Sequence, residues 1–156
     1  MRIRKLKKED YEQVKALEIQ VHKLHSKARP DVFKKDESGV LNYEDFLQIL
    51  NNAKYICYVC VQENKIVGEL LAFIKTGTPA PFMKNRKILY IESLCVDASM
   101  QHKGVGTKLI NHAKKLAKLQ GCEAIELNVW AFNNNAIEFY KTQGMSVKTM
   151  VYEVKL

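Results

Sequence analysis

Residues 89–107 read LYIESLCVDASMQHKGVGT, and this stretch decides the fold. Residues 88–96 are mostly apolar and predict a buried strand, and residues 99–106 predict a glycine-containing loop. The helix that follows is predicted over residues 107–120 by apolar side chains at three- and four-residue steps: Leu109, Ile110, Ala113, Leu116 and Ala117. A strand, a short glycine loop and a helix together form a compact α/β unit.

The loop Gln101-His102-Lys103-Gly104-Val105-Gly106 predicts an anion site. A helix begins with unpaired backbone N–H groups and the positive end of its dipole, and glycines let that backbone approach a ligand closely. Lys103 and Lys108 add positive charge, and no acidic residue lies between Asp97 and Glu123. A pyrophosphate suits such a site, whereas the alternative is a flexible strand–helix turn without a ligand.

Two familiar phosphate-binding motifs do not fit this loop. The P-loop requires G-x-x-x-x-G-K-[ST], which the spacing of Gly104 and Gly106 excludes. The dinucleotide fingerprint G-x-G-x-x-G requires a third glycine where this chain has Leu109.

The rest of the chain predicts a mixed, three-layer α/β domain. Asp10 and Gln13 suggest a capping box that opens a helix, Asn42 suggests the cap of a second helix, and Glu63-Asn64 suggests a hairpin turn. The expected strands cover residues 3–6, 55–61, 66–74, 88–96, 124–130 and 145–154. The order β-α-α-β-β-β-α-β-α-β then describes one domain over residues 1–156.

Composition excludes several classes of protein. The chain has 156 residues, of which 47% are hydrophobic and 27% are charged, so whole-chain disorder and collagen-like repeats are excluded. No apolar run approaches the roughly 20 residues of a transmembrane helix, and no apolar segment of a signal peptide follows residues 1–8. We therefore expect a cytoplasmic protein without a membrane partner.

The cysteines and histidines predict no metal site. We expect Cys57, Cys60, Cys95 and Cys122 to be free, mostly buried thiols. Cys57 and Cys60 form C-x-x-C within a predicted strand, where residues three apart point to opposite faces. His22 and His25 lie three apart on a predicted helix without further ligands.

The net charge of +8 raises the question of a polyanionic partner. A basic nucleic-acid-binding module is one reading of that charge. The lysines of residues 107–120 instead form an ordinary solvated helix face, and no aromatic RNA-binding strand is present. We expect no nucleic-acid partner.

Three segments together resemble the Gcn5-related N-acetyltransferases, the GNAT superfamily. Gln101-x-x-Gly104-x-Gly106 is similar to the family's acyl-CoA loop, and residues 89–97 are similar to its fourth strand. The segment from Asn133 through Ala136 and Phe139-Tyr140 to Gly144 is similar to its N-x-x-A-x-x-F-Y-…-G-F motif, with Met145 in place of an aromatic residue. The resemblance implies a mostly antiparallel sheet with a V-shaped split between the fourth and fifth strands.

The same resemblance implies acetyl-CoA as cofactor and gives its binding residues. The pantetheine arm would pair with the strand backbone at Leu94, Cys95 and Val96. The pyrophosphate would bind the amides of Gln101, His102, Lys103, Gly104, Val105, Gly106 and Thr107. Asn133 would hydrogen-bond the cofactor arm, although Asn is also a favoured helix N-cap.

Glu92 and Tyr140 are the catalytic candidates. Glu92 is the one acid in residues 88–96, where it would remove the amine proton directly or through water; a strand-end ion pair is the alternative. Because side chains alternate between the two faces of a strand, Glu92 is expected on the same face as Leu94 and Val96. Tyr140 matches the family's tyrosine that protonates the leaving thiolate, and its alternative is a packing role beside Phe139.

The acceptor is less defined by the sequence. The first two helices and their loop would form the wall of an amine pocket, and we expect Arg29 and Phe33 of that loop to contact substrate; the alternative is an internal ion pair of Arg29 with Asp31. The expected reaction transfers acetyl to a primary amine of a small molecule or protein by direct attack in a ternary complex. A catalytically inactive acyl-CoA sensor is the alternative, and a homodimer is compatible with the resemblance.

Overall fold

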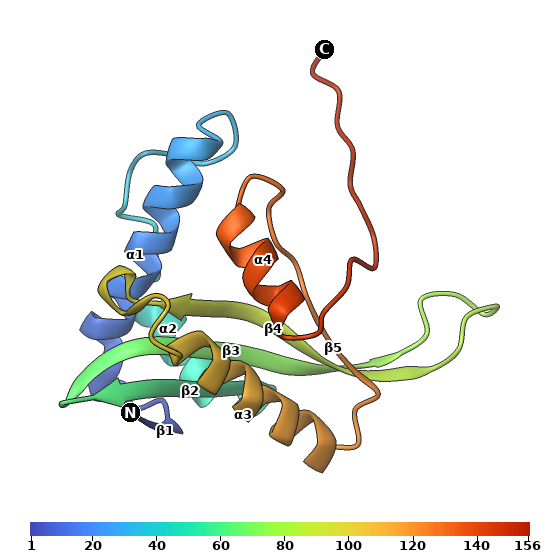
Figure 1. Cartoon of the computed structure of the whole chain (residues 1–156), viewed down its shortest axis with the longest axis horizontal. Coiled ribbons are helices and arrows are strands. Elements are labelled where there is room, and N and C mark those ends of the chain that lie inside the picture. The colour runs from blue at the N-terminus through green and yellow to red at the C-terminus, as the bar shows by residue number, and fades with distance from the viewer.

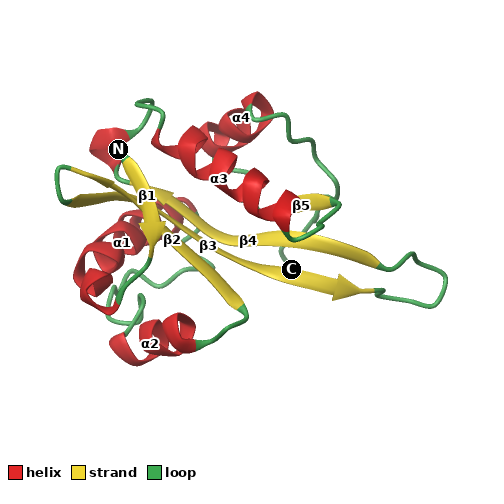
Figure 2. Ribbon diagram, turned by 90° about the horizontal axis from the view of Figure 1, so that it is seen from below, coloured by secondary structure: helices red, strands yellow, loops and turns green.

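The computed structural model describes residues 1–156 as a five-stranded sheet between two layers of helices (Figures 1 and 2). Helices α1 and α2 cover one face of the sheet, and α3 and α4 cover the other (Figure 2). The strands are β1 (Arg2–Lys5), β2 (Tyr55–Gln62), β3 (Lys65–Gly77), β4 (Arg86–Val96) and β5 (Ala124–Leu127). The helices are α1 (Tyr11–Ala28), α2 (Tyr43–Asn51), α3 (Val105–Leu119) and α4 (Asn134–Thr142), with short 3-10 turns at Lys8–Asp10 and Ala98–Met100.

The sheet has the order β1-β2-β3-β4-β5. Neighbouring strands from β1 to β4 are antiparallel, whereas β4 and β5 are parallel. The parallel pairing ends where Ile91 lies opposite Leu127. From Ser93 onward, β4 pairs with β3 alone, so the sheet is split between β4 and β5 as predicted.

A β-bulge lies in β4 where this split begins. Leu71 pairs with Ser93 and Ala72 pairs with Ile91, which leaves Glu92 without a partner on β3. Ile91 and Leu94 are three residues apart but pack into the same hydrophobic core. The bulge inserts one residue into the alternation, so counting in twos does not carry across it, and the face on which Glu92 lies stays a prediction.

Two hydrophobic cores fix the helices to the sheet. On the α3 side, Val105, Leu109, Ile110, Ala113 and Ala117 pack against β3 and β4. On the other side, the core contains these residues of α1, α2, β2, β3 and β4: Val14, Leu17, Phe46, Val59, Val61, Ile66 and Cys95. Because both cores meet β4, its position beside the split is held from both faces.

Three helix caps were considered from the sequence, and the structure contains two of them. The Asn42 side chain accepts a hydrogen bond from the Asp45 N–H and begins α2, as predicted. The Asn133 side chain likewise accepts from the Ala136 N–H and begins α4. The capping box of Asp10 and Gln13 was wrong: Asp10 binds Arg4 at 2.6 Å, and Gln13 accepts from the Ile66 N–H on β3.

The predicted last strand is also absent. Residues 145–156 form no strand, and the sheet ends at β5, which stops at Leu127 rather than at residue 130. The segment instead runs away from the body of the molecule beyond α4 (Figure 1). None of the helices has the length and apolar character needed to cross a membrane.

Candidate active site

The loop before α3 forms a cradle of free backbone N–H groups. His102 has φ 60° and Gly104 has φ 81°, and such left-handed residues turn successive N–H groups toward one side of the chain. The N–H groups of residues 102–107 donate to no acceptor within the chain, because the first donor of the helix is Lys108, which bonds Gly104. This arrangement suits an anion with several oxygens.

The two glycines of the cradle have different roles. Gly104 is the N-cap of α3, has positive φ, and has open space where a side chain would begin. A Cβ at Gly106 would lie 2.9 Å from Cζ of Phe139. Gly106 therefore lets the first turn of α3 approach α4, while Gly104 leaves the cradle open.

Asp97 anchors the strand end that precedes the cradle. Its carboxylate accepts from the Ser99 N–H at 2.9 Å and from the Ser99 hydroxyl at 2.5 Å, and it pairs with Lys65 at 3.2 Å. The hydrogen bond from Ser99 lowers the pKa of Asp97 to about 2. The backbone N–H of Asp97 also bonds the carbonyl of Val67, so the turn is fixed to β3.

A groove of about 550 Å³ lies along α3 and includes Gly104 and Thr107 of the cradle. Its other lining residues are Ile3, Lys108, Asn111, His112 and Lys115. Because Ile3 belongs to β1, at the far end of the sheet from β5, the groove lies away from the split. The cradle thus opens both to this basic groove and to the split.

The β4 segment from Glu92 to Val96 presents an unpaired backbone edge to the split. The side chains of Leu94 and Val96 pack against the α3-side core, and that of Cys95 is buried on the opposite face. The backbone between them is therefore held in extended form with one edge free, which is the requirement for pairing with an extended ligand.

Glu92 is exposed and is the first residue of β4 beyond the parallel pairing. Its carboxylate forms no ion pair and no side-chain hydrogen bond within the chain, unlike the strand-end salt bridge considered as its alternative. The bulge places this free carboxylate at the apex of the split, and bulges commonly redirect a side chain beside an active site.

Tyr140 and Asn133 approach the split from α4. Tyr140 is half-buried against the α3-side core, and its hydroxyl makes no hydrogen bond within the chain. The pKa of Tyr140 is raised to about 12, mainly by burial and to a smaller extent by the nearby Cys95. The hydroxyl therefore keeps its proton at neutral pH. Asn133 uses its side-chain oxygen to cap α4 at 3.2 Å, which leaves its amide NH₂ free.

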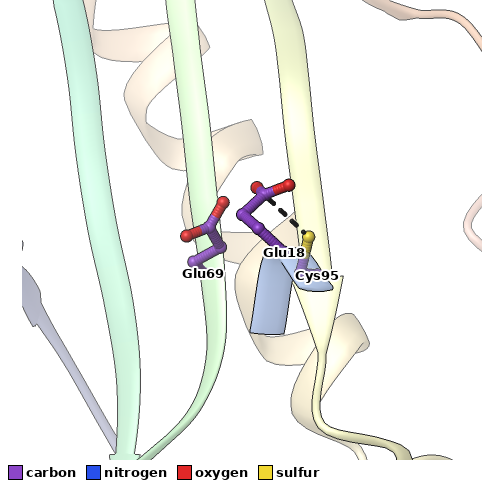
Figure 3. Close-up of side chains that lie close together, drawn as sticks. All are labelled: Glu18, Glu69 and Cys95. Atoms are coloured by element: carbon purple, nitrogen blue, oxygen red, sulfur yellow. Dashed lines mark hydrogen bonds between the residues drawn. The ribbon is translucent and has the colours of Figure 1, made fainter. Parts of the chain in front are cut away.

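A buried polar cluster that we did not predict joins α1, β3 and β4 (Figure 3). The Ser93 hydroxyl lies 2.8 Å from Glu18 Oε1 and 3.1 Å from Glu69 Oε1, and Cys95 Sγ lies 3.5 Å from Glu18 Oε1. The Ser93 hydroxyl has one proton and donates it to one of these carboxyl groups at a time. Burial, together with the neighbouring Glu18, raises the pKa of Glu69 well above its usual range.

The sequence contained a signal for part of this cluster. Glu69 is a single acid within the apolar residues 66–74, the same pattern that drew attention to Glu92. Glu18 gives no such signal, because an acid on an amphipathic helix is usually solvated. Only the packing of α1 on the sheet brings Glu18 to Ser93.

Arg29 and Phe33 lie together beside the chain that follows β5. Arg29 binds Asp31 with hydrogen bonds of 2.9 Å and 2.7 Å, so the internal ion pair considered as the alternative to substrate contact is present. Its guanidinium lies 5.5 Å from the ring of Trp130. The ring of Phe33 packs against the rings of His25 and Trp130, with distances between ring centroids of 5.1 Å and 5.3 Å. The three rings form an aromatic cluster at one end of α1.

A comparison with known protein families matches residues 18–145 to the model of the acetyltransferase (GNAT) family. This chain belongs to the GNAT family. The match begins within α1 and includes the split, the cradle and α4, so the resemblance inferred from three segments is confirmed. GNAT proteins are acyltransferases, which agrees with the predicted class of enzyme.

Curated GNAT relatives are similar over parts of their length. An uncharacterized N-acetyltransferase of Methanocaldococcus jannaschii is 39% identical over 69 residues, which cover 44% of this chain and 30% of that protein. N-alpha-acetyltransferase 60 of Xenopus tropicalis is 28% identical over 119 residues, covering 66% of this chain and 49% of that protein. The chain thus spans less than half the length of these two relatives.

A solved GNAT-like structure matches the whole chain. A crystal structure of a mutant protein from Bacillus halodurans has a TM-score of 0.96 and 34% identity, covering 100% of this chain and 99% of that one. An aminoglycoside N-acetyltransferase in complex with CoA has a TM-score of 0.71 at 15% identity, covering 99% and 100% of the two chains. The second similarity concerns the fold alone.

Proposed function

We propose that this protein is an acetyl-CoA-dependent N-acetyltransferase that transfers the acetyl group to a primary amine by direct attack in a ternary complex. One observation carries the proposal: six consecutive free N–H groups, at residues 102–107, adjoin the unpaired edge of β4. A pyrophosphate needs several free N–H donors, and an extended pantetheine arm needs an unpaired strand edge. Family membership supports the same chemistry.

The residues present fit the cofactor. The pyrophosphate would bind the free amides of residues 102–107, where Lys103 and Lys108 supply countercharge. The N–H of Gln101, which was also expected to bind it, donates to the carbonyl of Ala98 instead. The arm would pair with Leu94, Cys95 and Val96, and the free amide NH₂ of Asn133 would donate to it from α4. Gly104 supports this placement because the space above it is open.

When bound, acetyl-CoA supplies the thioester carbonyl carbon that the amine nitrogen attacks, after which the C–S bond breaks and CoA leaves as a thiolate. Glu92 takes a proton from the attacking amine, since an ammonium has no lone pair for attack. A backbone N–H of β4 at Cys95 or its neighbours donates to the developing oxyanion. Tyr140 would donate its phenolic proton to the thiolate and regain a proton, directly or through water, from the nitrogen as the amide forms. Its half-buried position beside the split supports that role.

The acceptor amine would enter from the side of α1. Arg29 and Phe33 are proposed to form part of its pocket, because they lie on an aromatic cluster with Trp130 beyond the end of β5. Named structural neighbours include aminoglycoside acetyltransferases, and one curated relative is an N-alpha-acetyltransferase, so small-molecule and protein amines both enter the test. The cytoplasmic location and the absence of a nucleic-acid partner stay predictions.

The test is acceptor-dependent release of CoA thiol. The purified chain is incubated with acetyl-CoA and, separately, with a polyamine, free amino acids, an aminoglycoside, and peptides with a free N-terminus or lysine. We expect one class to accelerate thiol release and to gain 42 Da per acetyl group, about the mass of C₂H₂O, by mass spectrometry. Binding of acetyl-CoA without acceptor-dependent release across the panel would contradict catalysis and leave an acyl-CoA-binding protein.

A further inference from the structure

The buried polar cluster of Glu18, Glu69, Ser93 and Cys95, here called the carboxyl cluster, contains two acids but no cation. The chain has 25 Lys and Arg residues, yet neither carboxyl group forms an ion pair with any of them. Glu69 is only 6% exposed, and its one hydrogen-bond donor is the Ser93 hydroxyl, which it shares with Glu18. A buried acid without a cationic partner is costly, and such groups gather at functional sites.

The carboxyl cluster lies beside the proposed base. Ser93 directly follows Glu92 on β4 and lies beyond the end of the parallel pairing at Ile91. Ser93 and Glu18 are partly exposed, whereas Glu69 and Cys95 are buried (Figure 3). Because Glu18 belongs to α1, the cluster lies on the side from which the acceptor amine would enter.

A small cavity adjoins the two carboxyl groups. It has a volume of about 40 Å³ and lies between α1, α2, β2 and β3. Glu18 and Glu69 are its only charged lining residues, and most of the others are apolar. A cavity needs about 10–15 Å³ to hold one water molecule, so a small group has room beside these acids.

The oxygens of the cluster match an alkylammonium group, which carries three N–H donors and no acceptor. The Ser93 hydroxyl oxygen lies 2.8 Å from an oxygen of Glu18 and 3.1 Å from an oxygen of Glu69. Three oxygens grouped so closely can all accept from one ammonium. The raised pKa of Glu69 agrees with this arrangement, because a proton takes the place of the missing cation.

A metal ion is the other cation that such a cluster could hold. Ligand atoms of Glu18, Glu69 and Cys95 lie within 4.8 Å of one another. Burial raises the pKa of the Cys95 thiol well above its usual range, so the thiol keeps its proton. Because cysteine binds metals as a thiolate, this set of donors favours an ammonium over a metal ion.

We propose that the carboxyl cluster binds a second ammonium group of the acceptor, which is therefore a diamine or a longer polyamine. One amino group lies at Glu92 and is acetylated, while the other stays charged and is held by Glu18 and Ser93. The inference rests on the proposed function and names its acceptor class. It also gives a chain of net charge +8 a local negative site for a cationic substrate.

Acceptors that differ by one amino group test the proposal. Linear diamines of three to six carbons are each compared with the monoamine of the same length, such as putrescine with butylamine. We expect wild type to favour the best diamine by at least about 30-fold in kcat/KM, the scale of a hydrogen bond to a charged group. In Glu18→Gln, which keeps the size of the side chain, this ratio is expected to fall toward one, mostly through a higher KM for the diamine.

The matched control is Glu12→Gln, which changes an exposed acid on the same helix and is expected to keep the wild-type ratio. A wild-type ratio near one would overturn the proposal. So would a preference for the diamine that survives unchanged in Glu18→Gln.

Calorimetry with the same amines separates this proposal from the proposed function. If no amine is acetylated but a diamine binds wild type and not Glu18→Gln, the cation site stands and the proposed catalysis fails. If both amines of each pair are acetylated equally well, the catalysis stands and the cation site fails. Neither acetylation nor diamine binding, or binding of Zn²⁺ but of no diamine, would also overturn the cation site.

Discussion

Glu69 is a carboxyl group enclosed by protein and facing a second carboxyl group, Glu18. Burial and Glu18 both raise its pKa, so the folded protein holds a proton that the unfolded chain releases. Above the unfolded pKa of about 4.5, each unit of pH then favours unfolding by up to about 1.4 kcal/mol until Glu69 ionises in the fold. This cluster makes stability decline as pH rises.

Glu69→Gln is expected to remove that pH dependence while preserving shape and hydrogen bonding to Ser93. The variant should gain melting temperature relative to wild type as pH is raised from 5 to 8, because Gln has no proton to lose. Thermal unfolding across this range measures it, with the exposed turn variant Glu63→Gln as control. A constant difference between Glu69→Gln and wild type at all pH values would show that Glu69 is ionised in the fold.

Tyr140→Phe removes the hydroxyl proposed to protonate the leaving thiolate and keeps the ring. We expect kcat to fall by about 100-fold while the Kd for acetyl-CoA stays within a factor of three, because the proton is needed only in the transition state. Steady-state kinetics and calorimetry measure the two quantities. Tyr58→Phe on β2 is the control, and an unchanged kcat in Tyr140→Phe would remove the tyrosine from the mechanism.

Glu92→Gln tests the base at the apex of the split. The substitution should lower kcat/KM near neutral pH by at least about 100-fold. The loss should shrink as pH approaches the pKa of the acceptor amine, because solvent then deprotonates the nucleophile. A pH–rate profile of both proteins measures this effect. A profile parallel to that of wild type would assign Glu92 no role as base.

At the scale of elements, the end of β4 and the start of α3 depend on Asp97. Its pKa of about 2 in the fold lies below the unfolded value of 3.8, so the carboxylate stabilises the fold above pH 4 and this contribution disappears as pH falls through 2. The shift corresponds to about 2 kcal/mol at neutral pH.

Asp97→Asn is therefore expected to lower the free energy of unfolding by about 2 kcal/mol at pH 7 and by much less near pH 2. Urea denaturation at both pH values measures the difference. The control is Asp36→Asn, since Asp36 binds Ser38 in a similar turn but is exposed to solvent. Equal losses for the two variants at pH 7 would mean that Asp97 does not anchor the strand end.

The elements also show which features a sequence can predict. Asn42 and Asn133 were predicted as caps because a cap depends on residues within one turn of helix. The bulge at Glu92 was not predicted, because it depends on the register with β3, which local alternation does not contain. Ser93 and Glu18 are 75 residues apart, so their contact arises only from the packing of α1 on the sheet.

At the scale of the whole molecule, residues 145–154 were predicted as a strand because their alternation is that of a strand. In the structure, residues 145–156 form no strand and do not pair with the sheet. The fold class and the loop before α3 were predictable from local patterns, whereas the split was expected only from the family resemblance. Arg29 and Phe33 were singled out from the sequence, but their contact with Trp130 was not predicted, because Trp130 comes from a distant segment.

The central claim is that the cradle before α3 binds the pyrophosphate of acetyl-CoA. Calorimetric titration with acetyl-CoA tests it most directly, using wild type, Gly104→Asp and Gly104→Asn. Asp and Asn have similar size and both tolerate the positive φ at this position, so the two variants differ in charge. We predict micromolar binding to wild type, at least about 100-fold weaker binding to Gly104→Asp, and a smaller loss for Gly104→Asn. No binding to folded wild type, or equal affinities of the two variants, would contradict the account.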